Sequence, residues 1–336
     1  MIHVFQNFKI QTILLGLFAL FCSIQNQAAT IPPHVHTPLK VFCDLCGCST
    51  SSGSSGFGTL DNLSFVGLRY IYQDYESKDG IFSNSPTSKE RFNTYQVWGR
   101  IPVNDKFYFN AIVPYQDLYR HFEDRTEHIN GLGDITVIGW YQLKFFKKHK
   151  AHEVDFNHVE GEDDERELSA HRLNVGIGLK LPTGEFEDML TDRINPGFQV
   201  GTGTLDAIFS VLHSYSKNKL GVNTSATYYL KTENKNEYRF GNQFSFSSNV
   251  YYNLPLEKSA FSPFLGISGD VYNSIKQFNE ALPETNGNIV NGAFGSEFMI
   301  DQFIIGANYT FPISQNLFGE NVTSKNRFMV YLNYVL

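Results

Sequence analysis

The feature that most constrains this chain is an alternation of apolar and polar residues that recurs from about residue 63 to residue 336. In residues 172–181, for example, Arg172, Asn174, two glycines and Lys180 alternate with leucine, valine and isoleucine. Successive side chains of a strand point to opposite faces, so the pattern predicts β-strands with one apolar face. Twelve such segments can be identified: 63–75, 92–103, 107–119, 133–146, 170–182, 203–216, 220–232, 239–252, 262–273, 290–300, 303–313 and 326–336.

The connections between these segments alternate between long and short. Residues 104–106 and 217–219 are short turns, whereas residues 76–91 and 183–202 are long loops. Outer-membrane β-barrels have an even number of antiparallel strands, with short turns on one side and longer loops on the other. Only residues 147–169 are long where the alternation requires a short turn. The sequence therefore predicts an all-β fold, a transmembrane antiparallel up-and-down β-barrel of about 12 strands.

The first 29 residues have the layout of a cleaved secretory signal peptide. One lysine precedes an apolar core from Ile13 to Phe21, and small residues follow it. No later apolar run is long enough for a transmembrane helix, and Phe (30), Tyr (18) and Gly (27) favour strands. A closed barrel is the β-structure that can span a membrane without leaving an unpaired edge in lipid. A soluble secreted β-sandwich would show the same periodicity and remains the alternative.

The last ten residues, RFMVYLNYVL, favour the barrel. Their apolar residues fall at alternate positions counted back from the C-terminus, which resembles the sorting signal of outer-membrane barrels, with Leu336 where Phe is usual. We expect a protein of the Gram-negative outer membrane with both termini in the periplasm, in contact with membrane lipid and with a periplasmic partner as a further possibility. The expected organisation is a signal peptide (1–29), an arm with a Ser/Gly-rich linker (30–62) and a barrel (63–336), with 147–169 as a charged periplasmic insertion.

Three stretches resemble a known family when taken in order. They are GLGDITVIGWYQL (131–143), GLKLPTGEF (178–186) and PGFQVGTGTLDAIFSV (196–211). Together they resemble the outer-membrane barrels of the MetA pathway of phenol degradation, which are grouped with FadL-like and porin-like transporters. The resemblance implies a passive channel for small, and in some cases apolar or aromatic, molecules. It does not extend to residues 30–60 or 147–169.

The same stretches also have a direct physical interpretation. Gly131 and Gly133 permit a sharp entry from a loop into a strand. Pro182 has no backbone N–H group, so it ends a strand where no further hydrogen-bond donor is needed. We expect Asp206 to point into the lumen beside Lys180. A polar lumen gated by long outer loops would then select solutes by its electrostatic field and by its width. The charged side chains predicted to line that lumen are Arg69, Arg100, Arg172, Lys180, Asp206, Lys231, Asp270, Glu297 and Arg327.

The sequence carries little that indicates an enzyme. It has no Gly-x-Ser-x-Gly elbow, no His-Glu-x-x-His helix and no phosphate-binding loop. His213 and Ser214 are neighbours in a predicted strand, so their side chains point to opposite faces and cannot form a nucleophile–base pair. The net charge of −7 gives no basic surface for nucleic acid. We therefore predict a protein that is not an enzyme and does not bind nucleic acid.

One motif before the barrel suggests a different function. Cys43, Cys46 and Cys48 form a Cys-x-x-Cys-x-Cys pattern, with His34 and His36 upstream. Thiolates favour copper(I) or zinc, so a metal-handling outer-membrane protein is the alternative function. A disulfide with one free thiol, or a segment that only caps the pore, are the other interpretations, since the periplasm is oxidising. The acidic insertion 147–169, with three histidines, could bind metal weakly or be a solvated loop.

Overall fold

The computed structural model describes residues 64–78, 87–146, 169–187, 198–257 and 259–336. The predicted signal peptide, the Cys/His arm and nearly all of the charged insertion lie outside these residues. All described residues belong to one compact unit, Lys40–Leu336. Within them there is no helix long and apolar enough to cross a membrane.

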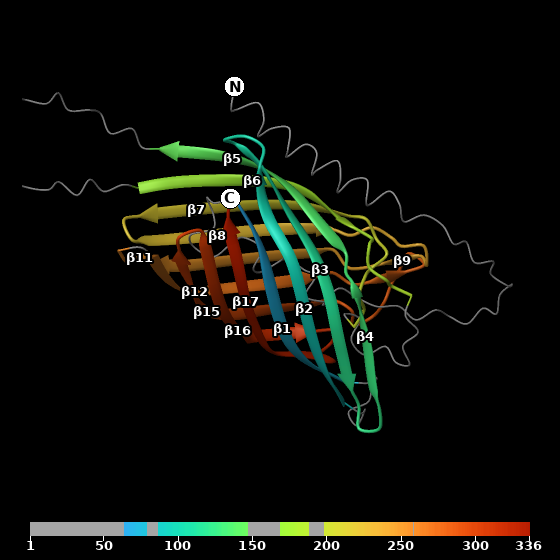
Figure 1. Cartoon of the computed structure of the whole chain (residues 1–336). Helices are drawn as coiled ribbons and strands as arrows, with labels where there is room; N and C mark the ends of the chain where they lie inside the picture. The colour runs from blue at the N-terminus through green and yellow to red at the C-terminus, as the bar shows by residue number, and fades with distance from the viewer. Residues whose placement is uncertain (1–63, 79–86, 147–168, 188–197, 258) are drawn as a thin grey trace, which may run out of the picture. The chain divides into compact units, whose positions relative to one another are not determined.

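In the described part of the chain, twelve long antiparallel strands close into a barrel, which confirms the predicted fold (Figure 1). Each strand pairs with its neighbours in sequence, and β1 pairs with β17 to complete the ring. The long strands are β1 (Phe65–Lys78), β2 (Thr87–Pro102), β3 (Phe107–His121), β5 (Ile135–Phe146), β6 (Ser169–Leu181), β7 (Asp206–Lys217), β8 (Leu220–Leu230), β10 (Gln243–Tyr252), β12 (Ser259–Tyr272), β15 (Gly287–Ile300), β16 (Phe303–Leu317) and β17 (Val322–Val335).

The two ends of the barrel differ in their connections. At one end, here called the short-turn end, residues 103–106, 218–219 and 301–302 form tight turns, and β1 begins where β17 ends. At the other, the long-loop end, residues 182–205, 231–242 and 273–286 join the strands. Two of these loops pair with each other through β9 (Tyr238–Arg239), β13 (Lys276–Gln277) and β14 (Glu280–Ala281). The remaining short strand, β11 (Leu254–Pro255), pairs with the start of β12.

The connection between the expected strands 107–119 and 133–146, residues 120–132, is not the long loop that the strand pattern predicts. Thr126–Leu132 forms strand β4, which pairs with the last seven residues of β3 and extends the barrel wall as a hairpin (Figure 1). β3 exchanges its partner β5 for β4 around Pro114, whose carbonyl accepts a hydrogen bond of 2.8 Å from the Gly133 amide. Polar residues predominate in this segment, Thr-Glu-His-Ile-Asn-Gly-Leu, so it lacks the apolar face by which the other strands are recognised.

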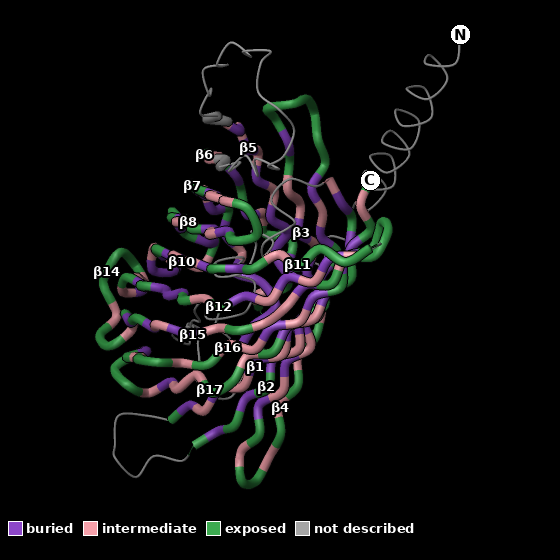
Figure 2. The backbone as a smooth tube through the Cα atoms, turned by 90° about the vertical axis from the view of Figure 1, so that its left-hand side faces the viewer, coloured by how far each residue is buried: buried purple, intermediate pink, exposed green. Residues whose placement is uncertain are grey.

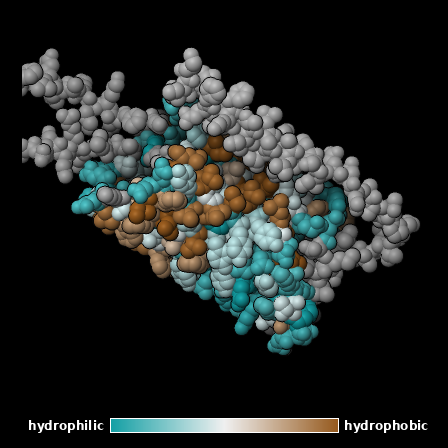
Figure 3. All heavy atoms as spheres, in the orientation of Figure 1, coloured by the Kyte–Doolittle hydropathy of each residue, from teal (hydrophilic) through white to brown (hydrophobic). Residues whose placement is uncertain are grey.

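Burial alternates along the strands and separates the two faces of the wall (Figure 2). The outward face exposes large apolar side chains such as Leu68, Ile177 and Leu265, which are 61%, 65% and 69% exposed. On the face shown in Figure 3, hydrophobic residues form a band across the strands, with hydrophilic residues beyond it at the end of the β3–β4 hairpin. Aromatic pairs such as Phe303–Tyr334 and Tyr70–Tyr95 lie on the outward face of the wall. An outward apolar band flanked by aromatic residues is the surface that a barrel presents to lipid.

The inward face is mixed, so the prediction of a polar lumen was only half right. Polar residues such as Gln96 and Asn174 face inward, but so do Trp98, Trp140 and Phe264. The inward apolar residues form clusters, one around Trp98 and Tyr331 and another around Trp140 and Tyr108. A barrel of about this strand number has an interior that side chains can largely fill.

Candidate functional site

Apolar side chains fill the barrel at its long-loop end. They come from strands on opposite sides of the ring and from loops that fold inward between them, so they form one cluster across the opening. We call this the mouth cluster: Tyr75, Phe92, Leu118, Phe198, Tyr238, Phe240, Tyr272, Ile275, Ile289, Leu317, Phe318 and Val322.

Phe198 holds the loop between β6 and β7 in this cluster. Its ring is fully buried and lies 4.2 Å from the Cζ atom of Arg120. Nε of Arg120 is also 2.9 Å from the Glu90 carboxylate, and a second nitrogen is 3.4 Å from Glu127. A fully buried arginine is stable only when it is paired in this way. Glu90 escaped the sequence analysis because the segment expected there began at residue 92.

The three stretches that carry the family resemblance meet beside the mouth cluster. The Thr183 hydroxyl donates to the Gly133 carbonyl over 2.8 Å and accepts from the Ile135 amide over 2.9 Å. The Asp134 carboxylate accepts from the amides of Gly184 and Thr202, each over 3.0 Å. One buried carboxylate therefore ties all three stretches together. Asp134 was missed as a site residue because its role depends on loops that are distant in sequence.

Two glycines permit this close approach. A Cβ on Gly201 would lie 2.3 Å from the Gly184 carbonyl oxygen, and a Cβ on Gly184 would lie 2.7 Å from Cα of Gly201. Gly203 adopts a φ of +67°, which side chains with a Cβ rarely tolerate, and it lies against the Phe186 ring. Glycines near both ends of the loop 182–205 thus allow the two ends to make direct backbone contact.

A buried network of alternating charges lies under this corner. Nζ of Lys180 is 2.9 Å from Asp206 and 3.2 Å from Asp134, and Nζ of Lys231 is 3.5 Å from Asp206. The Lys180 ammonium also donates to the Thr202 hydroxyl over 2.5 Å. The four charged side chains are at most 4% exposed. Two cations and two anions compensate each other here, so the corner carries no net charge.

The other predicted lumen charges also face inward. Cζ of Arg69 lies 4.3 Å from the Trp98 ring, and Cζ of Arg100 lies 4.4 Å from the Tyr108 ring. The Glu297 carboxylate accepts from the Tyr331 hydroxyl over 2.5 Å. The Asp270 carboxylate accepts from Ser245 and Gln243, and Arg172 and Arg327 are half-buried on the inward side of their strands. The role of these nine residues in solute selection stays a prediction.

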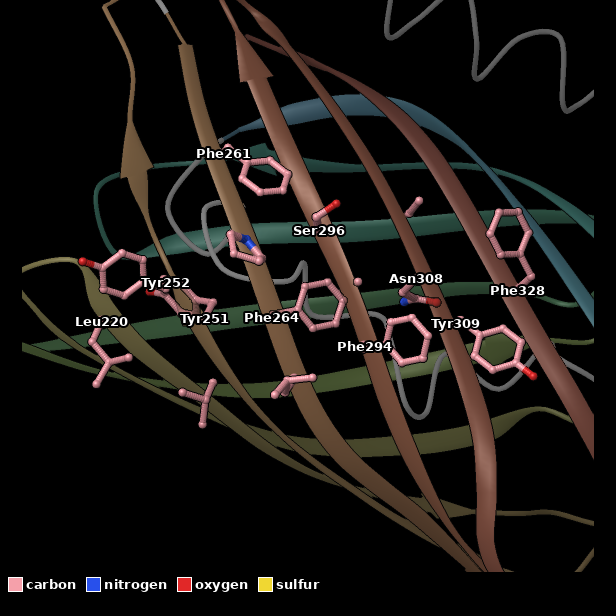
Figure 4. Close-up of a pocket in the computed structure, with 15 residues that line it drawn as sticks. Leu220, Tyr251, Tyr252, Phe261, Phe264, Phe294, Ser296, Asn308, Tyr309 and Phe328 are labelled. Carbon is pink, nitrogen blue, oxygen red and sulfur yellow. The ribbon is translucent and has the colours of Figure 1, made fainter.

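The outward face carries an apolar groove of about 710 Å³ across β10, β12, β15 and β16. Figure 4 shows the rings of Phe294, Tyr309 and Phe328 among the side chains that line it. Leu265 and Phe294 in its lining are 69% and 50% exposed, so the groove opens on the side where lipid is expected. It is a feature of the membrane-facing surface, distinct from the interior.

The candidate metal ligands Cys43, Cys46, Cys48, His34 and His36 lie outside the described residues. In the part of the chain that the structure describes, no group of three or more His, Cys, Asp or Glu residues could hold a metal ion. His213 is exposed on the outward face while Ser214 is buried on the inward face, so they do not form a nucleophile–base pair. The absence of enzymatic activity stays a prediction.

A closed antiparallel barrel with an apolar outward band defines the class of outer-membrane β-barrel proteins. Within that class, the model of the family described as the MetA pathway of phenol degradation matches residues 90–329, and the chain belongs to this family. The prediction from the three Gly-rich stretches is thereby confirmed. No curated protein matches the sequence.

Solved structures share the barrel. The COG4313 outer membrane channel from Pseudomonas putida F1 superposes with a TM-score of 0.56 at 10% identity, covering 82% of this chain and 96% of its own. A FadL homologue from Pseudomonas aeruginosa has a TM-score of 0.36 at 10% identity, with coverage of 88% and 99%. At these identities the likeness concerns the fold alone.

Proposed function

We infer that this protein is a passive outer-membrane channel for small apolar or aromatic molecules. Its long-loop end would face the cell exterior, and its short-turn end, with both termini, would face the periplasm. Outer-membrane barrels place short turns on the periplasmic side and long loops outside, which supports this orientation. A periplasmic partner stays a prediction.

The mouth cluster is the observation that carries this proposal. A hydrated ion or sugar entering between Phe92, Phe198 and Phe318 would lose water without gaining polar partners there. An apolar or aromatic solute would instead exchange contacts with the rings that close the opening. The inward clusters around Trp98 and Trp140 continue this apolar surface toward the short-turn end.

Passage requires the mouth cluster to open. An internal pocket between Gln73, Asp270 and Arg327 has a volume of about 30 Å³, which is room for one or two water molecules and not for an aromatic ring. In this conformation the side chains of the mouth cluster fill the described part of the long-loop end. The inward-folded loops would therefore act as the gate.

The proposal can be tested with 1-N-phenylnaphthylamine, an apolar aromatic dye that an intact outer membrane excludes. Gram-negative cells expressing the full chain should take up the dye several-fold faster than cells carrying an empty vector. Uptake of a hydrophilic chromogenic cephalosporin, measured in the same cells, controls for general damage to the membrane. Equal rates of dye uptake with and without the protein would contradict the proposed channel.

A further inference from the structure

Strand register places a row of polar side chains across four neighbouring strands on the inward face. Arg172 on β6 lies opposite Ser214 on β7, Ser214 lies opposite Asn223 on β8, and Asn223 lies opposite Asn249 on β10. Asn174 is two residues from Arg172 and points to the same side. We call Arg172, Asn174, Ser214, Asn223 and Asn249 the amide row. It lies toward the short-turn end and is separate in sequence and position from the mouth cluster.

Two of these amides are buried and have no hydrogen-bond partner within the described residues. Asn174 is 1% exposed and Asn223 is 3% exposed, and neither the oxygen nor the nitrogen of either side chain is bonded to any described residue. Nε of Arg172 has no partner there either. Buried polar atoms are almost always hydrogen-bonded, so unbonded donors and acceptors on the same inward face of β6 and β8 indicate a site that a polar group can occupy.

An aromatic surface adjoins the row. Trp140 on β5 lies opposite Gly176, so its ring covers a position two residues from Asn174. A Cβ on Gly176 would lie 2.8 Å from the Trp140 ring, so a larger residue at position 176 would clash with the indole. Trp140 also stacks on Tyr108, with centroids 6.0 Å apart and an angle of 12° between the planes. Polar and apolar surfaces therefore meet here, which favours a ligand with a polar head and an apolar body.

The charges at this end favour an anionic head. Near the short-turn end, the described inward side chains include Arg69, Arg100 and Arg172 against one acid, Glu297, whose carboxylate is bonded to Tyr331. Toward the long-loop end, the described inward cations Arg120, Lys180, Lys231 and Arg327 are accompanied by the acids Glu90, Glu127, Asp134, Asp206 and Asp270. The excess of positive charge is confined to the short-turn end.

We propose that the amide row binds the carboxylate of an amphipathic organic acid whose apolar body lies against Trp140. Arg172 supplies the charge, and the nitrogens of Asn174 and Asn223 supply neutral donors that a carboxylate accepts. The inference rests on the proposed channel function and assigns to it, among apolar and aromatic solutes, molecules that also carry an acidic head.

Benzoate and its neutral isostere benzamide separate charge recognition from ring binding. Calorimetric titration of the detergent-purified full chain at pH 8 should give a dissociation constant for benzoate at least tenfold lower than that for benzamide. Arg172→Gln should abolish this preference, and Asn223→Leu should weaken benzoate binding by about tenfold, because each removes a hydrogen bond to the anion. Asn308→Leu is the matched control: Asn308 is 4% exposed on β16, outside the row, and its replacement should leave the benzoate constant unchanged.

Equal affinity for benzoate and benzamide, absence of binding, or equal losses in Asn223→Leu and Asn308→Leu would each overturn the amide row as a carboxylate site. Dye uptake, measured in cells expressing the same variants, reports on the channel independently. A wild-type protein that admits the dye but does not prefer benzoate would refute the row and leave the channel standing. One that prefers benzoate but admits no dye would refute the channel instead.

Discussion

The Cζ atom of Arg120 lies 4.2 Å from the ring of Phe198, although the two residues belong to a barrel strand and to a loop 78 positions further along the chain. The same guanidinium binds Glu90 on the neighbouring strand. The loop is therefore fixed to the wall by a residue that the wall itself holds in place. Phe198 is thus a defined point at which the closure of the mouth can be altered.

We expect Phe198→Ala to loosen the mouth. Truncating a buried phenylalanine costs about 3–5 kcal/mol and leaves a cavity between Phe92 and Arg120. Cells with this variant should take up phenylnaphthylamine faster than wild type. Phe209→Ala is the control, since Phe209 is 47% exposed on the outward face and its truncation should not change uptake. Unchanged uptake in Phe198→Ala would show that the mouth cluster is not the barrier.

Burial should make the Lys180–Asp206 pair much more strongly coupled than a surface pair of the same length. Nζ and the carboxylate are 2.9 Å apart at 4% and 0% exposure, whereas Lys235 and Glu187 are 2.8 Å apart at 61% and 47% exposure. In double-mutant cycles, the lysine is changed to Gln and the acid to its neutral amide, and stability is measured by urea unfolding. The coupling free energy should be about 2 kcal/mol for the buried pair. The surface pair should give about 0.5 kcal/mol or less. Similar coupling in both would contradict a structural role for the buried network.

Gly201→Ala should damage the corner where the three Gly-rich stretches meet. Its Cβ would lie 2.3 Å from the Gly184 carbonyl oxygen, a backbone atom that cannot move without displacing the Asp134 contacts. We expect most of this variant to migrate as the unfolded form on gels of unheated samples. Gly131→Ala is the comparison, because its Cβ would meet only the Val200 side chain at 3.3 Å. A normal folded yield for Gly201→Ala would show that the two ends of the loop between β6 and β7 need not touch.

The cysteine motif before the barrel yields a separate prediction. If Cys43, Cys46 and Cys48 bind copper(I) or zinc, the purified full chain should carry metal that is lost when all three become serine. Elemental analysis after growth in copper- or zinc-supplemented medium measures this directly. Equal metal content in both proteins would remove the metal-handling function and leave an oxidised or capping segment.

The strands could be predicted from sequence because one face of each must be apolar. In the last strand, Phe328, Leu332 and Tyr334 are outward and exposed, while Met329 and Tyr331 are inward and buried. Periodicity assigned these residues to two faces, but it could not show that the side chains of the inward face also pack against one another. Met329 and Tyr331 are buried in the interior of a narrow barrel, where burial of apolar side chains stabilises the fold as it does in the core of a soluble protein.

The candidate site was only partly predictable, for a related reason. Lys180 and Asp206 stand at the ends of adjacent predicted strands, so their proximity followed from the topology. Asp134, Arg120 and Phe198 acquire their roles from loops that fold back into the opening. Such contacts depend on backbone paths of ten or more residues with no repeating pattern, and alternation carries no information about them.

The pairing of β1 with β17 has a consequence for how this molecule is made. Phe65 lies beside Val335, so the first strand finds its partner only after nearly the entire chain is available. Until that moment the growing sheet has two open edges, each able to capture another strand. Contacts between such distant residues also slow folding, since the loop between them must close first. Ring closure should therefore be a late step in assembly, and a chain lacking its last strand should be captured by chaperones or aggregate.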